Sequence, residues 1–132
     1  MFQDILPLLE SWFGQNIANL YRGQPWRGRG LLMACPVWGD KYLERFEKYC
    51  LPSIMAPKNY ETLRGRCRIV LFTDAASYTK LLGFTEGMED VGFDLDICLI
   101  PNELMATLPK GPDDPDFAAK QLNKYWILGV AQ

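Results

Sequence analysis

The sequence predicts a three-layer α/β domain in which a mostly parallel, Rossmann-like sheet has helices on both faces. Three mainly apolar segments have the length and composition of covered strands, at residues 31–35, 68–72 and 95–100. Segments with helical spacing separate them, and this alternation favours parallel strands joined by right-handed crossovers. With 132 residues, 48% of them hydrophobic, the chain is long enough for one domain with a substantial core.

Residues 2–21 have the three- and four-residue spacing of apolar side chains that is typical of an amphipathic helix. Pro7 and Gly14 lie inside this stretch, so the sequence leaves open whether it forms one helix or two. Its apolar face could pack on its own domain, which we favour, or bind a partner, including a second copy of the chain. We therefore divide the chain into an N-terminal helix and linker, residues 1–29, and an α/β domain, residues 30–132.

The linker, residues 21–30, is rich in glycine and contains three arginines beside Trp26. Such a segment could bind a phosphate or serve as a solvated connector. We favour the connector because Gly28 and Gly30 precede the first strand, whereas the glycines of a dinucleotide-binding motif follow it. The arginines are Arg22, Arg27 and Arg29.

The segments between the strands carry helix start and stop signals. Asp40 is placed to cap a helix that runs to about Cys50, and Gly83 is placed to close a helix at residues 75–82. Asp114 is placed to cap the last helix, which has no stop signal before Gln132, so the predicted fold is incomplete at its C-terminal end. The expected inner stripe of that helix is Ala118, Leu122, Tyr125, Trp126, Gly129 and Val130.

Composition argues against several function classes. The net charge of −2 provides no basic field for nucleic acid, and the absence of histidine excludes histidine triads, bases and metal ligands. No apolar run approaches the roughly 20 residues that span a membrane. No two cysteines have the CxxC spacing of a zinc or redox motif, so we expect buried, reduced thiols in a cytoplasmic protein. The cysteines are Cys35, Cys50, Cys67 and Cys98.

In open α/β sheets, ligands bind at the carboxyl ends of the strands. At these ends, Trp38 could stack on a base or sugar ring or be a partly buried packing residue, and Gly39 would let a ligand approach the backbone. Asp74 could accept hydrogen bonds from a ribose or a base, cap the following helix, or do both. The candidate nucleotide-binding residues are Pro36, Val37, Trp38, Gly39, Thr73 and Asp74, and the third strand end is at Pro101 and Asn102.

Asp94 and Asp96 are a candidate pair for a divalent cation that bridges a diphosphate. They precede a strand, however, and this places them at the opposite edge of a parallel sheet from the other candidates. We therefore favour a solvated strand start for these two aspartates.

Three segments resemble the beginning of bacterial glycosyltransferase-like proteins, which are similar to the nucleotide-diphospho-sugar transferases of the GT-A fold. They are LLMACPVWGDKY (residues 31–42), LPSIMAPKN (residues 51–59) and IVLFTD (residues 69–74). The resemblance implies that the turn from Pro36 to Gly39 lines a nucleotide and that Asp74 contacts its base or ribose. It also implies an Asp-x-Asp motif that holds a divalent metal, Mn or Mg. In the family this motif ends the strand that follows the last helix, so it is a different position from Asp94 and Asp96 and lies outside residues 1–132.

The expectation that follows is a nucleotide-binding part of a glycosyltransferase-like protein. Sugar would be transferred from a nucleotide-diphospho-sugar, but the chain alone would be inactive, because neither a catalytic residue nor a metal ligand is identified in it. The alternatives are a non-catalytic interaction or scaffold domain and another Rossmann-like enzyme that uses a different nucleotide.

Overall fold

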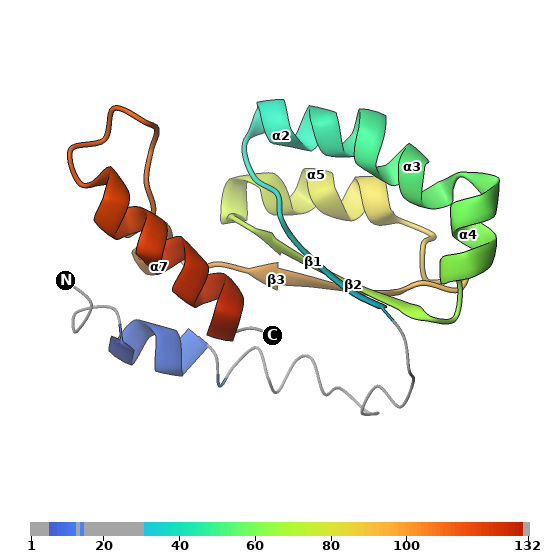
Figure 1. Ribbon diagram of the computed structural model, residues 1–132, viewed down its shortest axis with the longest axis horizontal. Coiled ribbons are helices and arrows are strands. Elements are labelled where there is room, and N and C mark those ends of the chain that lie inside the picture. The colour runs from blue at the N-terminus through green and yellow to red at the C-terminus, as the bar shows by residue number, and fades with distance from the viewer. Residues whose placement is uncertain (1–5, 13, 15–30, 131–132) are drawn as a thin grey trace. The chain divides into compact units, whose positions relative to one another are not determined.

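The computed structural model describes residues 6–12, 14 and 31–130, with side chains described up to residue 124. The chain divides into two compact units, Trp26–Leu99 and Met1–Pro25 with Ile100–Gln132. The predicted linker and most of the predicted N-terminal helix lie outside the described residues, and residues 6–12 are helical. The first unit (Figure 1) contains β1 (Leu31–Pro36), α2 (Asp40–Arg45), a π-helical turn (Phe46–Cys50), α3 (Leu51–Met55), α4 (Pro57–Leu63), β2 (Cys67–Thr73), α5 (Ala75–Thr85) and β3 (Asp94–Leu99), and the second contains α6 (Asn102–Met105) and α7 (Phe117–Val130).

The three strands form a parallel sheet in the order β1-β2-β3. Cys35 of β1 lies opposite Leu71 of β2, and Leu71 lies opposite Ile97 of β3. All three predicted strands are present, with ends displaced by no more than one residue. The predicted α/β class, with a parallel sheet and surrounding helices, is therefore confirmed.

Helices α2 to α5 lie over one face of the sheet (Figure 1). Ile69 and Leu71 of β2 contribute to the core on this face, where they join Phe46 from the π-helical turn and Leu81 from α5. Both crossover connections therefore place their helices on the same side, as expected when successive parallel crossovers share one hand.

The central and edge strands differ in burial. Val70 and Phe72 of β2 point to the sheet face opposite α2 to α5, and both are buried, so β2 is covered on its two faces as an apolar strand requires. In β1, by contrast, no residue is buried, and Leu31 and Leu32 are 49% and 42% exposed. The expectation that β1 is covered on both faces was wrong: Met33 and Cys35 pack against the core under α2 to α5, whereas Leu32 on the other face remains exposed.

The helix that begins at Asp40 extends to Met55, beyond the end predicted near Cys50. It passes through the π-helical turn, and Pro52 follows two residues later. Proline lacks the N–H that would close an ordinary helical turn, so the widened turn before it is a local accommodation of Pro52. In α5, Gly83 does not close the helix as predicted: α5 extends to Thr85, because a helical glycine is only mildly unfavourable.

The predicted inner stripe of α7 was wrong at Leu122, which is 61% exposed. The neighbouring Asn123 is buried instead, and its Nδ2 donates a hydrogen bond to the Thr107 carbonyl, with an N–O distance of 3.1 Å. A carbonyl partner therefore makes burial of the amide favourable, which apolar periodicity alone does not detect. Ala118, another residue of the predicted stripe, is also exposed. The side chains of Tyr125, Trp126, Gly129 and Val130 lie outside the described residues.

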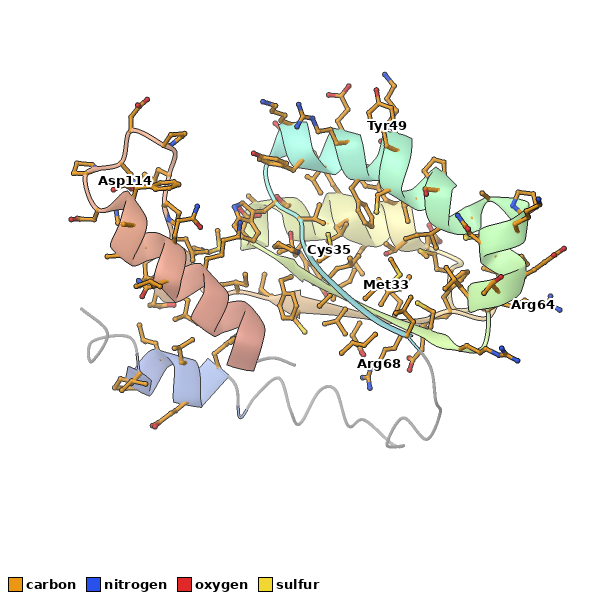
Figure 2. The ribbon with its side chains drawn as sticks, viewed as in Figure 1. Met33, Cys35, Tyr49, Arg64, Arg68 and Asp114 are labelled. Carbon is orange, nitrogen blue, oxygen red and sulfur yellow. The ribbon has the colours of Figure 1, made fainter. Side chains whose placement is uncertain are left out.

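The start of α7 also differs from the prediction. The helix begins at Phe117, so Asp114 precedes its first turn and does not cap it. The Asp114 carboxylate (Figure 2) accepts hydrogen bonds from Lys120 Nζ and from the backbone N–H of Asp116. The hydrogen bond from Lys120 is the main cause that lowers the pKa of Asp114. Asp114 thus fixes the loop before α7.

Two adjacent leucines on α5 test the assignment of its buried side. Leu81 is 0% exposed and Leu82 is 45% exposed. We expect Leu81→Ala to lower the free energy of unfolding by about 2–5 kcal/mol, because it leaves a cavity in the core. Leu82→Ala is the matched control and should cost less than about 1 kcal/mol. Urea denaturation followed by circular dichroism measures both, and equal losses would contradict the assignment.

Candidate functional site

The carboxyl ends of β1 and β2 lie side by side. Pro36, the last residue of β1, is opposite Phe72, and the Val37 N–H donates to the Phe72 carbonyl at 2.8 Å. This bond extends the strand pairing by one residue into the turn before α2. Trp38 and Gly39 consequently follow at the edge of the sheet that also carries Thr73 and Asp74, as the sequence predicted.

A chain of hydrogen bonds joins the two strand ends. The Gly39 N–H donates to Ser77 Oγ at 3.0 Å, and the Ser77 N–H donates to Asp74 Oδ1 at 2.8 Å. Asp74 is the N-cap of α5, so the predicted capping role is confirmed. Ser77 is buried. One serine therefore connects the cap of α5 to the turn that starts α2.

Gly39 adopts a backbone conformation that favours glycine, with φ 82° and ψ 144°. It is the N-cap of α2, and its carbonyl accepts from the N–H groups of Tyr42 and Leu43. A Cβ added at Gly39 would meet nothing within 4 Å, so the space in front of this residue is open.

The predicted capping role of Asp40 was wrong, because Gly39 takes that position and Asp40 is the first residue of α2. The Asp40 carboxylate instead pairs with Lys80 Nζ of α5 at 2.8 Å, and this hydrogen bond lowers the pKa of Asp40. Both side chains are exposed, so the pair is a second, weaker connection between α2 and α5.

The six candidate residues divide by accessibility. Trp38 is half-buried, Gly39 is exposed and Asp74 is partly exposed, so these three can meet a ligand. Val37 belongs to the core, and Thr73 is completely buried, so the side chains of these two residues are not accessible to a ligand. Pro36 is partly exposed, whereas Pro101 and Asn102, from the third predicted strand end, belong to the other unit.

The Asp74 carboxylate has one oxygen available. Its Oδ1 accepts the capping bond from Ser77, and its Oδ2 makes no hydrogen bond or ion pair within the described part of the chain. An ionised carboxylate can only accept hydrogen bonds. Asp74 can therefore hold α5 in place and, with its second oxygen, accept a hydrogen bond from a hydroxyl or N–H group of a ligand.

Thr73 carries an unsatisfied hydroxyl. Its side chain is 0% exposed, and Oγ1 has no hydrogen-bond partner among residues 6–12, 14 and 31–124. Leaving a buried hydroxyl unpaired costs about 1–3 kcal/mol, so such a group is uncommon in a structural position. It lies at the end of β2, directly before Asp74.

The two carboxylates of Asp94 and Asp96 interact with one basic side chain. Asp94 and Asp96 lie at the beginning of β3, and the Arg68 guanidinium (Figure 2) donates to Asp96 Oδ2 from Nε at 3.0 Å. Arg68 Nε also lies 3.9 Å from Asp94 Oδ2. The described residues contain no group of three or more acidic or cysteine side chains that could hold a metal ion.

The four cysteines are free, and burial raises the pKa of each thiol. For Cys98 the value reaches about 11, because its burial and the nearby Asp96 both disfavour the thiolate. A thiol of raised pKa is a poor nucleophile at neutral pH. The prediction of buried thiols is confirmed for Cys67 and Cys98, whereas Cys35 and Cys50 are only partly buried.

Sequence reasoning missed Ser77 and Lys80. Ser77 could have been found from its spacing, because it is a polar residue three positions after the helix cap Asp74. Their partners Gly39 and Asp40 are 38 and 40 residues away, however, and no local pattern relates such distant positions.

Alanine substitutions at Gly39 and Gly83 should have opposite effects on the free energy of unfolding. Gly39→Ala should lower the free energy of unfolding by about 1–3 kcal/mol, because alanine rarely adopts this backbone conformation. Gly83→Ala should raise it by about 0.5–1 kcal/mol, because Gly83 is helical and a Cβ there meets nothing within 4 Å. Chemical denaturation measures both, and a stable Gly39→Ala variant would disprove the backbone requirement.

The unsatisfied hydroxyl has a similar test. Thr73→Val should raise the free energy of unfolding by about 1 kcal/mol, because it removes a buried polar group without a partner and keeps the shape. Thr85→Val should lower it by about 0.5–1.5 kcal/mol, because Thr85 Oγ1 is buried and bonded to the Leu81 carbonyl at 2.9 Å. Destabilisation by Thr73→Val in thermal denaturation would show that its hydroxyl has a partner.

Comparison with known proteins does not add a relative. No protein-family model matches the chain, and no curated protein or solved structure was found to be significantly similar to it. Among the described helices, none is long and apolar enough to cross a membrane. The residues at the carboxyl edge of the sheet are therefore the basis for a functional assignment.

Proposed function

We propose that the chain is the nucleotide-binding part of a glycosyltransferase-like protein whose complete fold is three-layered and GT-A-like, with helices on both faces of the sheet. The supporting observation is that Trp38, Gly39 and Asp74 are accessible at the adjoining ends of β1 and β2, with open space at the Cβ position of Gly39. The nucleotide belongs to a nucleotide-diphospho-sugar, from which sugar is transferred in the complete protein.

Each accessible residue has a separate role in this proposal. The indole of Trp38 stacks on the base or ribose, and Gly39 leaves room for the ligand next to the backbone. Asp74 Oδ2 accepts a hydrogen bond from a ribose hydroxyl or a base N–H, while Oδ1 continues to cap α5. Ligand binding therefore does not require the hydrogen-bond chain from Gly39 to Asp74 to break.

The proposal assigns binding, and not transfer, to these residues. Asp94 and Asp96 are held by Arg68 at the other edge of the sheet, so they are no substitute for the acidic motif of the resemblance. We also propose a cytoplasmic location, because all four cysteines are free and lie partly or fully buried.

One observation favours the alternative of a non-catalytic interaction domain. β1 is an apolar strand whose residues are at most partly buried. An exposed apolar strand at a sheet edge is a surface that other chains can pair with.

Isothermal titration calorimetry with UDP and GDP, with and without manganese, tests the proposed function. We expect the chain to bind one of these nucleotides. Asp74→Asn should weaken that binding at least about tenfold, because the amide keeps the capping oxygen but replaces Oδ2 by a donor. Asp90→Asn, which makes the same change at an exposed position after α5, should leave binding unchanged.

The outcomes separate cleanly. No binding of either nucleotide would overturn the proposal. Binding that is equally strong in Asp74→Asn would place the nucleotide elsewhere on the chain. An unchanged melting temperature of Asp74→Asn would show that its binding defect does not arise from loss of the cap.

A further inference from the structure

Lys80 places a positive charge beside the proposed nucleotide site. Its Nζ lies 2.8 Å from Asp40 Oδ1, and Asp40 directly follows Gly39 in the chain. Only one aspartate side chain and one peptide unit separate the ammonium from Gly39, so the Lys80 nitrogen lies within about 10 Å of the Gly39 Cα. A nucleotide bound at this edge brings negatively charged phosphate groups to the same region.

The position of Lys80 on α5 directs its ammonium toward that edge. Ser77 and Lys80 are three residues apart, so they lie on the same side of the helix. Ser77 Oγ accepts from the Gly39 N–H, and Lys80 Nζ donates to Asp40, the next residue along. Helical side chains also lean toward the N-terminus of their helix, which for α5 is capped by Asp74. Lys80 therefore extends toward the end of the helix where Asp74 has its available oxygen.

The partner of Lys80 can be exchanged for another anion. The side chains of Lys80 and Asp40 are 60% and 88% exposed, so water weakens their attraction and a ligand can reach both. Phosphate oxygens accept charge-assisted hydrogen bonds from a lysine as carboxylate oxygens do. Replacing the carboxylate by a phosphate would therefore preserve the charge pairing of the ammonium.

We propose that Lys80 binds the phosphate group next to the ribose of the bound nucleotide, and that it releases Asp40 when it does so. This inference rests on the proposed function, in which Asp74 Oδ2 binds the ribose or the base. The phosphate then lies near Gly39, where the absence of a side chain leaves open space. Lys80 is thus the residue that selects nucleotides over nucleosides.

NMR titrations with uridine, UMP and UDP, and with guanosine, GMP and GDP, separate the phosphate contact from binding of the nucleoside. In Lys80→Gln, the dissociation constants of the monophosphate and the diphosphate should both rise about tenfold, because a charge-assisted hydrogen bond is lost. Affinity for the nucleoside should not change. Lys80→Arg keeps the charge and should retain most of the affinity for the phosphorylated ligands. Lys58→Gln, which removes the same charge at an exposed position on α4, is the matched control and should change none of these constants.

Asp40→Asn should have the opposite effect. It removes the carboxylate that competes with the phosphate for Lys80, so the monophosphate and the diphosphate should bind about two- to fivefold more tightly. If the ion pair only connected α2 to α5, Asp40→Asn and Lys80→Gln would break the same contact and change the affinity in the same direction. The sign of the two effects therefore distinguishes phosphate binding from a structural role.

Unchanged affinity of Lys80→Gln for the monophosphate and the diphosphate would overturn this inference and leave the proposed function in place. An equal loss of affinity for nucleoside and nucleotide in that variant would also contradict it, since the effect would not depend on the phosphate. Weaker nucleotide binding by Asp40→Asn would contradict it as well. If none of the six ligands bound to the unsubstituted chain, the proposed function itself would fail, and this inference with it.

Discussion

The hydrogen-bond chain from Gly39 through Ser77 to Asp74 is the constraint on which the carboxyl edge of the sheet depends. Parallel pairing alone aligns β1 with β2 only as far as Val37. Beyond that point, the buried Ser77 hydroxyl fixes the turn, and the same residue's N–H fixes the orientation of the Asp74 carboxylate. Because the bonds are partly buried, each lost partner would leave an unsatisfied polar group, so the arrangement is kept as a unit.

The edge that results combines packing with open chemistry. Val37 and Thr73 face the interior, whereas Trp38, Gly39 and one oxygen of Asp74 remain accessible. The aspartate is fixed by its own helix cap, so binding a ligand would not require the carboxylate to be reoriented. Such preorganisation lowers the entropy lost when a ligand binds, and it is the physical basis of the nucleotide site that we propose.

Sequence reasoning reached the strands and the location of this edge because both follow from local patterns. Apolar runs predicted each strand, and the polar residue after β2 predicted the cap at Asp74. The errors arose where distant contacts decide. Asn123 is buried because it bonds to Thr107, and Ser77 matters because Gly39 lies beside it in space.

The exposure of β1 has a similar explanation. Its composition is that of a strand covered on both faces, but composition does not specify which elements pack on each face. In the structure, Met33 and Cys35 pack against the core on one face, whereas Leu32 on the other face is exposed.

The most direct test of the proposed nucleotide site is a titration of the isotope-labelled chain with UDP and GDP, followed by NMR. Binding at the carboxyl edge predicts chemical-shift changes at the Trp38 indole N–H and at the backbone amides of Gly39 and Ala75. Gly65, which precedes β2 at the other edge, should remain unchanged. Changes centred on Gly65, or none with either nucleotide, would contradict the proposed site.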